Sequence, residues 1–167
     1  EAGIRDTLTG LFNRNYFEEH LKTEFHSAIR YSENISLLIL DIDHFKKVND
    51  THGHLVGDRV IRFVARTLEK NIKGKDCAAR YGGEEFTLLL PETPPAGARA
   101  VAENILKAVS QAQLVRADNK QPLGKITVSA GVAGYQRGED IMDFIDRADR
   151  ALYQSKNDGR NRVTVAK

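Results

Sequence analysis

Residues 82–85 (GGEE) set two adjacent carboxylic acids directly after two adjacent glycines. Strand-like runs flank them, residues 77–81 before and residues 86–90 after, so the segment predicts a β-hairpin whose turn is the glycine pair. Glycine permits a positive φ and lets a phosphate or a base approach the main chain without a Cβ in the way. A hairpin tip with bare main chain and paired acids indicates a ligand site, with an ordinary acidic turn as the alternative.

A second acidic strand end favours the ligand site. Residues 35–43 are apolar on both faces until Asp41 and Asp43, as expected for a central strand covered by helices. Acids two apart lie on one face of a strand. If the hairpin lies beside this strand, Asp41 and Glu84 converge, and carboxylates, a main-chain carbonyl and phosphates are the ligands that Mg²⁺ prefers. We rank Asp43 below Asp41 as a metal ligand, because Asp43 can instead orient the strand end.

A triphosphate at such a site needs cations, and the sequence has no Walker motif to supply a phosphate loop. The candidates are Lys46, just past the acidic strand end, and Lys156 with Arg160 near the end of the last long helix. Lys156 and Arg160 are four apart, so they share a helix face if the helix persists that far. Each cation alone is typical of a solvated surface charge, but with two convergent acids and a glycine turn they favour a metal–nucleotide site.

Three histidines, His44, His52 and His54, lie close together in the sequence and resemble a metal cluster. They have no cysteine partners and hard acids lie nearby, so we do not expect zinc. We expect His54 to pack or hydrogen-bond beside a nucleotide.

Length and composition bound the kind of protein. A chain of 167 residues fits a single domain, 1–167, that can bury a substantial core. A formal net charge of +2 is too small to argue for nucleic-acid or membrane binding, and no apolar run could span a bilayer. The lone Cys77 can form no internal disulfide, which favours a reducing cytoplasm. Because the chain starts without Met, we expect the C-terminal part of a longer, regulated protein, which could be membrane-anchored through its missing region.

The hydrophobic pattern predicts helices alternating with strands around the hairpin. In order, we expect a helix capped by Asn13 and running to about Glu33, strand 35–43, a short helix 44–50, the glycine-rich stretch 51–58, a helix to about Ile72, the hairpin, a helix opened by Pro94-Pro95, a surface loop 114–125, strand 126–133, a helix capped by Asp140 and stopped by Gly159, and strand 162–165. Hairpins mixed with crossover helices predict an α+β fold, with a central, mostly antiparallel sheet flanked by helices in a palm-like arrangement.

At this point the sequence resembles a known family. Residues 80–86 (RYGGEEF) resemble the signature of the GGDEF diguanylate cyclases in its GGEEF spelling. Further blocks resemble the family in the family's own order, namely residues 6–14, 41–50, 53–58, 129–132, 148–153 and 156–161. The resemblance therefore spans essentially the whole chain. It implies a palm-type fold like that of nucleotidyl cyclases and polymerases.

The resemblance implies that two GTP molecules are joined into cyclic di-GMP with release of pyrophosphate. Asp41, the main-chain carbonyl of Ile42 and Glu84 would hold Mg²⁺, with Mn²⁺ as the alternative ion. Glu85 would lie near the ribose 3′-hydroxyl, as a base or as a second metal ligand. Phosphoryl transfer needs positioned metals and cations rather than covalent machinery, which agrees with this set of side chains.

The resemblance also implies how the nucleotide is held. Asn49 and Asp58 would read guanine. The phosphates would be held by Lys46, Lys156, Arg160 and the main-chain amides of His44 and Phe45. Gly82 and Gly83 would leave room for the nucleotide to approach. An aspartate suits guanine, because it can accept two donors that adenine does not present in that arrangement.

One block departs from the family pattern. Many members carry an inhibitory product site, Arg-x-x-Asp, just before the signature, and here Lys73 replaces the arginine while Asp76 remains. A lysine cannot reproduce the planar, bidentate grip of arginine on phosphate and on the guanine edge. We therefore expect weakened product inhibition.

The product contains two nucleotides, whereas one domain would hold one GTP. Two domains must then face each other, which predicts a two-fold homodimer whose contact can be weak. Three other interpretations stay open: a catalytically idle module that binds GTP or cyclic di-GMP, a structural interaction domain in which the acids only cap turns, and an adenylate-type cyclase or polymerase palm, against which the guanine-reading residues speak.

Overall fold

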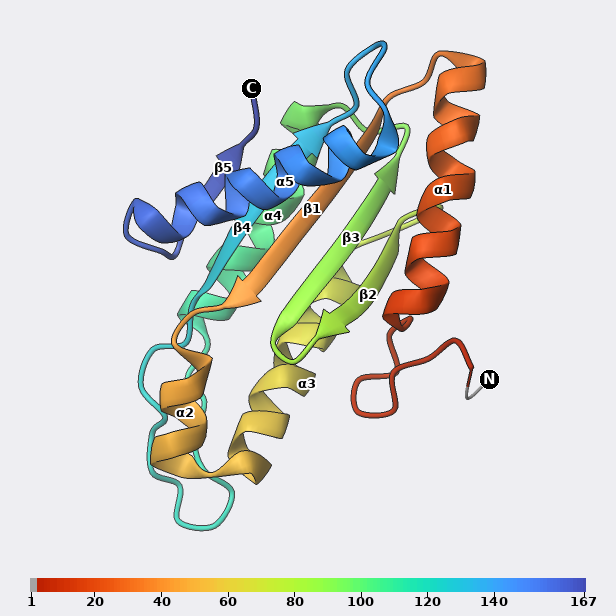
Figure 1. Cartoon of the computed structure of the whole chain (residues 1–167). Helices are drawn as coiled ribbons and strands as arrows, with labels where there is room; N and C mark the ends of the chain where they lie inside the picture. The colour runs from red at the N-terminus through yellow and green to blue at the C-terminus, as the bar shows by residue number, and fades with distance from the viewer. Residues whose placement is uncertain (1–2) are drawn as a thin grey trace.

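Five strands form one sheet in the order β2-β3-β1-β4-β5 (Figure 1). The computed structural model describes residues 3–167, in which β1 is Ile35–Ile42, β2 Cys77–Gly82, β3 Glu85–Pro91, β4 Val128–Gly134 and β5 Val163–Val165. Neighbouring strands are antiparallel except β4 and β5, which are parallel. The helices are α1 Arg14–Tyr31, α2 Phe45–His52, α3 His54–Asn71, α4 Pro95–Gln111 and α5 Ile141–Asn157. The predicted α+β fold with a mostly antiparallel, helix-flanked sheet is confirmed.

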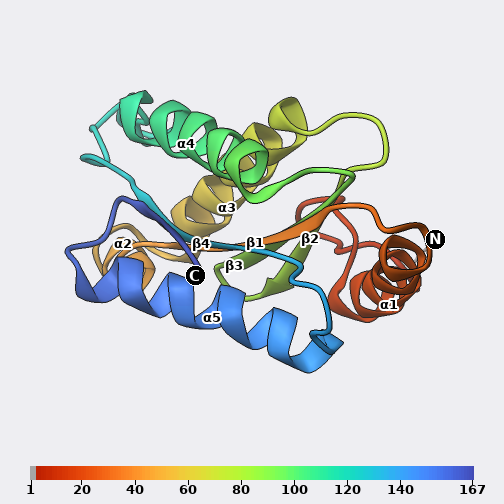
Figure 2. The ribbon, with the colours of Figure 1, turned by 90° about the horizontal axis from the view of Figure 1, so that it is seen from above.

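Helices cover both faces of the sheet, which is why β1 is apolar throughout (Figure 2). Leu38 and Leu40 point into the core shared with α2, α3 and α4. Leu37 and Ile39 point into the opposite core, shared with α1 and α5. Asp41 continues the second set, so its side chain lies on the α1 and α5 face of the sheet.

Side-chain caps begin two helices where the sequence predicts them. The Asn13 side chain accepts a hydrogen bond from the amide of Tyr16 at the start of α1, and the Asp140 side chain does the same for Asp143 at the start of α5. The predicted end of α1 near Glu33 is too late. The helix ends at Tyr31, because Ser32 takes the left-handed conformation with φ 52°.

The second correction concerns the glycine-rich stretch 51–58. We expected helix only after Asp58, but α3 already begins at His54 and contains Gly57. Gly57 is needed for packing rather than for a break, because a Cβ there would overlap the Asn49 side chain of α2. Smaller differences lie at strand ends: β1 ends at Ile42, and β4 starts at Val128 rather than at residue 126.

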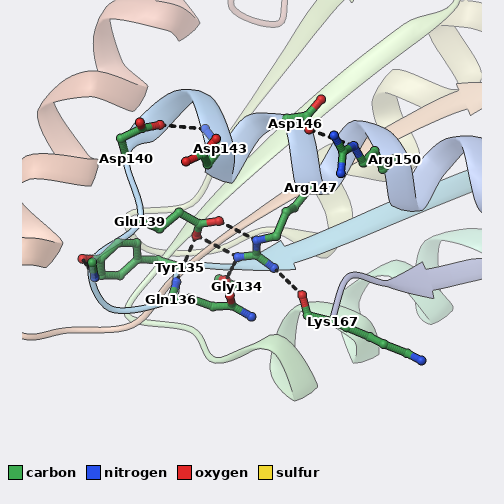
Figure 3. A network of polar contacts seen from close by, with 11 residues as sticks. Gly134, Tyr135, Gln136, Glu139, Asp140, Asp143, Asp146, Arg147, Arg150 and Lys167 are labelled. Carbon is green, nitrogen blue, oxygen red and sulfur yellow. Dashed lines mark hydrogen bonds and ion pairs between the residues drawn. The ribbon is translucent and has the colours of Figure 1, made fainter.

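Helix α5 lies directly on β4, since the two make a backbone-to-backbone contact at Gly131. A Cβ on Gly131 would lie less than 3.0 Å from main-chain atoms of Ala148, Ala151 and Leu152. The start of α5 is fixed by Arg147, whose guanidinium donates to the Glu139 carboxylate and to the carbonyls of Gly134 and Lys167 (Figure 3). These contacts fix the helix that carries Lys156.

The loop between α4 and β4 lies where the sequence predicts it. Residues 112–127 connect α4 to β4 without regular secondary structure except one isolated bridge, which confirms the surface loop predicted over 114–125.

Cys77 is buried, and burial raises the pKa of its thiol to about 12. No helix in residues 3–167 combines the length and apolarity that crossing a membrane requires.

Candidate active site

The β2–β3 hairpin forms as predicted, but its turn lies one residue later. Gly82 pairs with Glu85 and Arg80 pairs with Phe86, so the turn is Gly83-Glu84 and the ladder is irregular between Arg80 and Gly82. Neither Gly82 nor Gly83 has the positive φ that the sequence suggested. A Cβ on either would meet no atom within 4 Å, so both leave open space at the tip.

Arg80 links the hairpin turn to the N-terminal segment. Its guanidinium donates to the carbonyl of Gly83 at 2.8 and 3.0 Å and pairs with the Asp6 carboxylate at 3.3 Å. Asp6 in turn accepts from the amide and the hydroxyl of Thr9. Sequence reasoning missed this role, because Asp6 and Arg80 lie 74 residues apart and no local pattern joins them.

The acids of the hairpin meet the end of β1 at one end of the sheet, the lower end in Figure 1. Asp41 lies opposite Glu85 in the β1–β3 register. The amide of Ile42 donates to the carbonyl of Glu84 at 3.2 Å, which ties the strand end to the turn. Asp41, Ile42, Glu84 and Glu85 are therefore brought together, as the sequence predicts.

Lys156 of α5 supplies positive charge to this cluster. Its ammonium donates to Asp41 Oδ2 at 2.6 Å, and the side chains are 30% and 17% exposed. The other oxygen, Asp41 Oδ1, is buried without a hydrogen-bond partner. A buried carboxylate oxygen left unpaired is costly, and a cation is the group that it fits best.

Burial is the main influence on all three acids. It raises the pKa of Asp41, and the hydrogen bond from Lys156 only partly offsets this. It also raises the pKa of Glu84, to which the charge of Asp41 adds, and of Glu85, to which Asp149 of α5 adds first and Asp41 second. Asp149 is a neighbour that sequence reasoning did not identify. Three acids held above their ordinary pKa values form a site that a divalent cation would stabilise.

In the described residues, 3–167, no three His, Cys, Asp or Glu side chains are close enough together to hold a metal ion by themselves. Asp41 and Glu84 offer two carboxylates. Ile42 follows Asp41 in the sequence, and its main-chain amide donates to the carbonyl of Glu84. The donor set thus fits a hard cation that completes its coordination with main-chain and phosphate oxygens.

Both carboxylate oxygens of Asp43 are engaged by hydrogen-bond donors. Its two carboxylate oxygens accept from the hydroxyls of Thr127 and Ser129, both at 2.7 Å, and from the amide of Asn161 at 3.1 Å. This agrees with the lower rank given to Asp43, because these bonds attach the end of β1 to β4 and to the loop after α5. Thr127 and Asn161 are further contributors that the sequence did not reveal.

Lys156 and Arg160 do not share a helix face, because the condition that α5 persists to Arg160 is not met. Helix α5 ends at Asn157, and Arg160 lies in the following turn with φ 66°. Its amide donates to the carbonyl of Ser155 at 2.9 Å, so the turn folds back on the helix end. The positive charge of Arg160 lowers the pKa of Asp41, although less than the hydrogen bond and charge of Lys156 do.

Helices α2 and α3 carry the predicted guanine-reading pair. Asn49 packs against Gly57, next to Asp58 in the chain, and Asn49 Oδ1 is buried without a hydrogen-bond partner. Phe45 is buried at the start of α2, and His44 before it takes φ 54°. Lys46 is exposed and pairs with Asp50 at 3.2 Å.

Two other predicted positions lie away from the acids. His54 is exposed and lines a cavity of about 620 Å³ together with Leu55 and Arg116. The Lys73 amide donates to Asp76 Oδ2 at 3.1 Å, and burial raises the pKa of the Asp76 carboxyl. The two residues line a shallow cavity of about 430 Å³ on the loop before β2.

Comparison with known sequences identifies one family. The family model described as "Diguanylate cyclase, GGDEF domain" matches residues 3–162. "Diguanylate cyclase A" of Treponema denticola is 42% identical over 172 residues, covering 100% of this chain and 45% of that protein. "Diguanylate cyclase DgcM" of Escherichia coli K12 is 41% identical over 165 residues, covering 99% of this chain and 39% of that protein. The chain thus spans less than half the length of these relatives.

A solved structure agrees with the whole fold. The crystal structure of the GGDEF domain of DgcB from Caulobacter crescentus, in complex with c-di-GMP, is 43% identical and superposes with a TM-score of 0.97. The match covers 100% of this chain and 94% of that one, so sheet order and helix placement are shared throughout.

Proposed function

The chain belongs to the GGDEF family of diguanylate cyclases, and from that premise we propose that it condenses two GTP molecules into cyclic di-GMP, releasing two pyrophosphates. One observation carries the proposal. Asp41 and Glu84 lie close together at one end of the sheet, and Asp41 Oδ1 is a buried oxygen without a partner while Asp41 Oδ2 pairs with the Lys156 ammonium.

Asp41, Glu84 and the main-chain carbonyl of Ile42 would hold Mg²⁺ or Mn²⁺. An ion held by these residues would supply positive charge that neutralises the negative charge developing on the phosphates during transfer. The unpartnered oxygen of Asp41 and the raised pKa values of Asp41 and Glu84 support this assignment, because each is relieved by a cation.

The cations and the guanine pair would hold the nucleotide. Lys156 contacts Asp41 from α5, and the charge of Arg160 in the turn after it also acts on Asp41. Both cations would face the β- and γ-phosphates, and exposed Lys46 would join them with the amides of His44 and Phe45. Asn49 and Asp58 would read guanine, as the buried, unpartnered amide oxygen of Asn49 supports. Gly82 and Gly83 would leave the space that the nucleotide occupies.

Glu85 would lie beside the ribose 3′-hydroxyl. Burial and the charges of Asp149 and Asp41 raise its pKa, and a carboxylate with a raised pKa is a stronger proton acceptor at neutral pH. Its position opposite Asp41 places this acceptor next to the proposed metal ligands.

Each 3′-hydroxyl must attack the α-phosphorus of the other nucleotide, so the reaction needs two copies that face each other through their sites. We propose a two-fold encounter dimer. A longer protein would raise the effective concentration of the two domains.

Product inhibition should be weak in this chain. Lys73 stands at the arginine position of the family's inhibitory pattern, and Asp76 is partly engaged by the Lys73 amide. Calorimetry should find weak cyclic di-GMP binding at this site. Tight binding that disappears in Asp76→Ala would contradict the proposal.

The test is incubation with GTP and Mg²⁺ and identification of the product by mass. We expect cyclic di-GMP from the parent and from the exposed-acid control Glu19→Gln, and none from Glu84→Ala/Glu85→Ala. A thermal shift that is specific for GTP and depends on metal, without any product at high enzyme concentration, would instead assign an idle binding module.

A further inference from the structure

Helix α3 and the loop before β4 enclose a second surface feature, away from the acid cluster. A cavity of about 620 Å³ opens between the start of α3 and residues 116–118. A second cavity of about 320 Å³ continues along α3 against Leu114, Val115 and Leu123. The two share Arg59 and Arg62, so they are adjacent along α3, and together we call them the α3 groove.

The lining of the α3 groove is largely apolar. Val56 and Phe63 come from α3, and Leu114, Val115 and Leu123 come from the loop. Leu55 stands at the edge with 82% of its surface exposed. Leu55 extends this concave apolar surface, and contiguous apolar surface rimmed by polar residues is typical of interaction sites.

Arginines border this lining. Arg59, Arg62 and Arg66 are spaced i, i+3 and i+7, so they form one stripe along α3. None of the three forms an ion pair with a carboxylate of residues 3–167, whereas many other surface cations of the chain do. Arg59 only donates to the carbonyl of Val115 at 3.3 Å. Three arginines without acidic partners leave the groove positively charged.

The shape decides among anionic occupants. Residues 55–66 extend roughly 16 Å along the helix axis, about three turns. A groove of that length with apolar residues inside and cations at the border suits a helix that carries apolar side chains on one face and carboxylates on the other. A bilayer surface would instead call for a convex apolar face. Arg116, at one end, is already paired with Asp118 at 2.8 Å, so the uncompensated charge lies along α3.

From this charge complementarity we propose that the α3 groove docks an acidic amphipathic helix of a partner protein. Leucine-type side chains of the partner would enter the two cavities, and its carboxylates would meet Arg59, Arg62 and Arg66. The groove shares no residue with the acid cluster, so its occupancy can be measured without GTP or metal.

The probe is a fluorescein-labelled peptide of about 15 residues, with leucines at i, i+4, i+7 and i+11 and glutamates on the other face, which spans roughly 22 Å as a helix. Binding is followed by fluorescence anisotropy at low ionic strength. A scrambled peptide of the same composition, anionic phospholipid vesicles and duplex DNA are compared with it.

We expect the amphipathic peptide to bind and Arg62→Ala/Arg66→Ala to weaken it at least about tenfold, a loss of about 1.4 kcal/mol. Lys22→Ala/Arg30→Ala removes the same charge from α1 on the opposite face and should leave binding unchanged. Leu55→Ser, which touches no core residue because Leu55 is 82% exposed, should weaken it through lost apolar contact. Circular dichroism confirms that each variant is folded.

Several outcomes would overturn the proposal. Equal binding of the scrambled peptide would mean non-specific charge attraction. Unchanged binding by the α3 variant, or failure of the peptide to bind at all, would remove the groove as its site. Vesicles or DNA that bind through Arg62 and Arg66 while the peptide does not would assign the surface to a lipid or a nucleic acid.

Discussion

At the scale of single residues, Arg80 controls the shape of the hairpin tip. Its planar guanidinium donates two hydrogen bonds to one carbonyl of the turn and pairs with Asp6 on the opposite side. The glycines make the tip open, but they do not fix where it lies. Arg80 does, and through Ile42 the tip is attached to the end of β1.

Replacing Arg80 tests this positioning role. We expect Arg80→Ala to destabilise the domain by about 2 kcal/mol, the usual range for hydrogen bonds from a charged group. We also expect kcat for cyclic di-GMP formation to fall about tenfold or more with a smaller change in KM, because Arg80 contacts the turn rather than the nucleotide. Arg80→Lys keeps the charge but loses the planar guanidinium, so its stability and kcat should lie between those of the parent and of Arg80→Ala. Parent kcat in Arg80→Ala would contradict the role; urea unfolding and pyrophosphate release measure both effects.

The raised pKa of Glu84 makes a prediction about stability. Burial first, and the charge of Asp41 second, raise this pKa in the folded state above its unfolded value. Such a carboxyl favours the folded state most below the unfolded pKa, and this contribution is lost as pH rises through the folded pKa. Glu84→Gln should therefore raise the melting temperature at pH 8 without metal, and the gain should shrink in acid.

Melting curves between pH 4 and pH 8 measure this effect. The lower limit lies just below the ordinary glutamate pKa of about 4.3. Glu19→Gln on exposed α1 is the matched control and should leave the curve unchanged. A lower melting temperature of Glu84→Gln at pH 8 would show that the site does not strain the fold.

Much of the site could be predicted from residue types, and the remainder depends on contacts between distant segments. Acids at a strand end and at a glycine turn are visible locally, so Asp41, Glu84 and Glu85 were found. The partners of Asp43, namely Thr127, Ser129 and Asn161, come from other elements and carry no local signature. The helical spacing of Lys156 and Arg160 could relate them only if α5 continued to Arg160, and the helix ends before it.

At the scale of elements, glycines had two different structural uses that one sequence pattern cannot separate. Gly131 lets α5 contact the main chain of β4, and Gly57 lets α3 contact Asn49 of α2. Sequence reasoning treated the stretch around Gly57 as an interruption of helix, because glycine has low helix propensity. Tertiary packing overrides that preference here. Caps and apolar stripes, by contrast, act locally, and α1, α4 and α5 began where expected.

Two glycine-to-alanine changes separate packing from ligand access. Gly131→Ala forces a Cβ into main-chain atoms of α5, so we expect a loss of about 1–3 kcal/mol or more in urea unfolding. Gly82→Ala meets open space, so it should keep the parent stability while it weakens GTP binding. Equal stability of Gly131→Ala and the parent would mean that α5 shifts freely on the sheet.

At the scale of the whole molecule, the hairpin tip of the site reaches solvent at one end of the sheet. Helices cover both faces, while the β2–β3 turn lies at the lower end of the sheet in Figure 1, with Gly82 and Gly83 exposed and Glu84 and Glu85 half-buried. Two copies can therefore bring their acid clusters together without rearranging either core. Sequence reasoning predicted this fold class and sheet character well, because apolar runs and the hairpin define the layers. It did not predict the strand order, which depends on pairings between distant segments.

The need for two copies predicts how rate depends on enzyme concentration. Well below the dissociation constant of the encounter dimer, the rate should rise with the square of the domain concentration, and above it the rate should become linear. Pyrophosphate release over a dilution series measures this dependence. Strict proportionality down to nanomolar enzyme would argue that one copy suffices.

Cys77, the one sulfhydryl of the sequence, is enclosed in the core, and burial raises its pKa to about 12. Alkylating dyes react with the thiolate, so the native domain should be nearly inert toward them. A cysteine introduced at Tyr153, which is 67% exposed on α5, would then be the single labelling position. Donor and acceptor fluorophores attached there in separate batches would report the transient meeting of two molecules by energy transfer, at dilutions where neither chromatography nor scattering detects a pair.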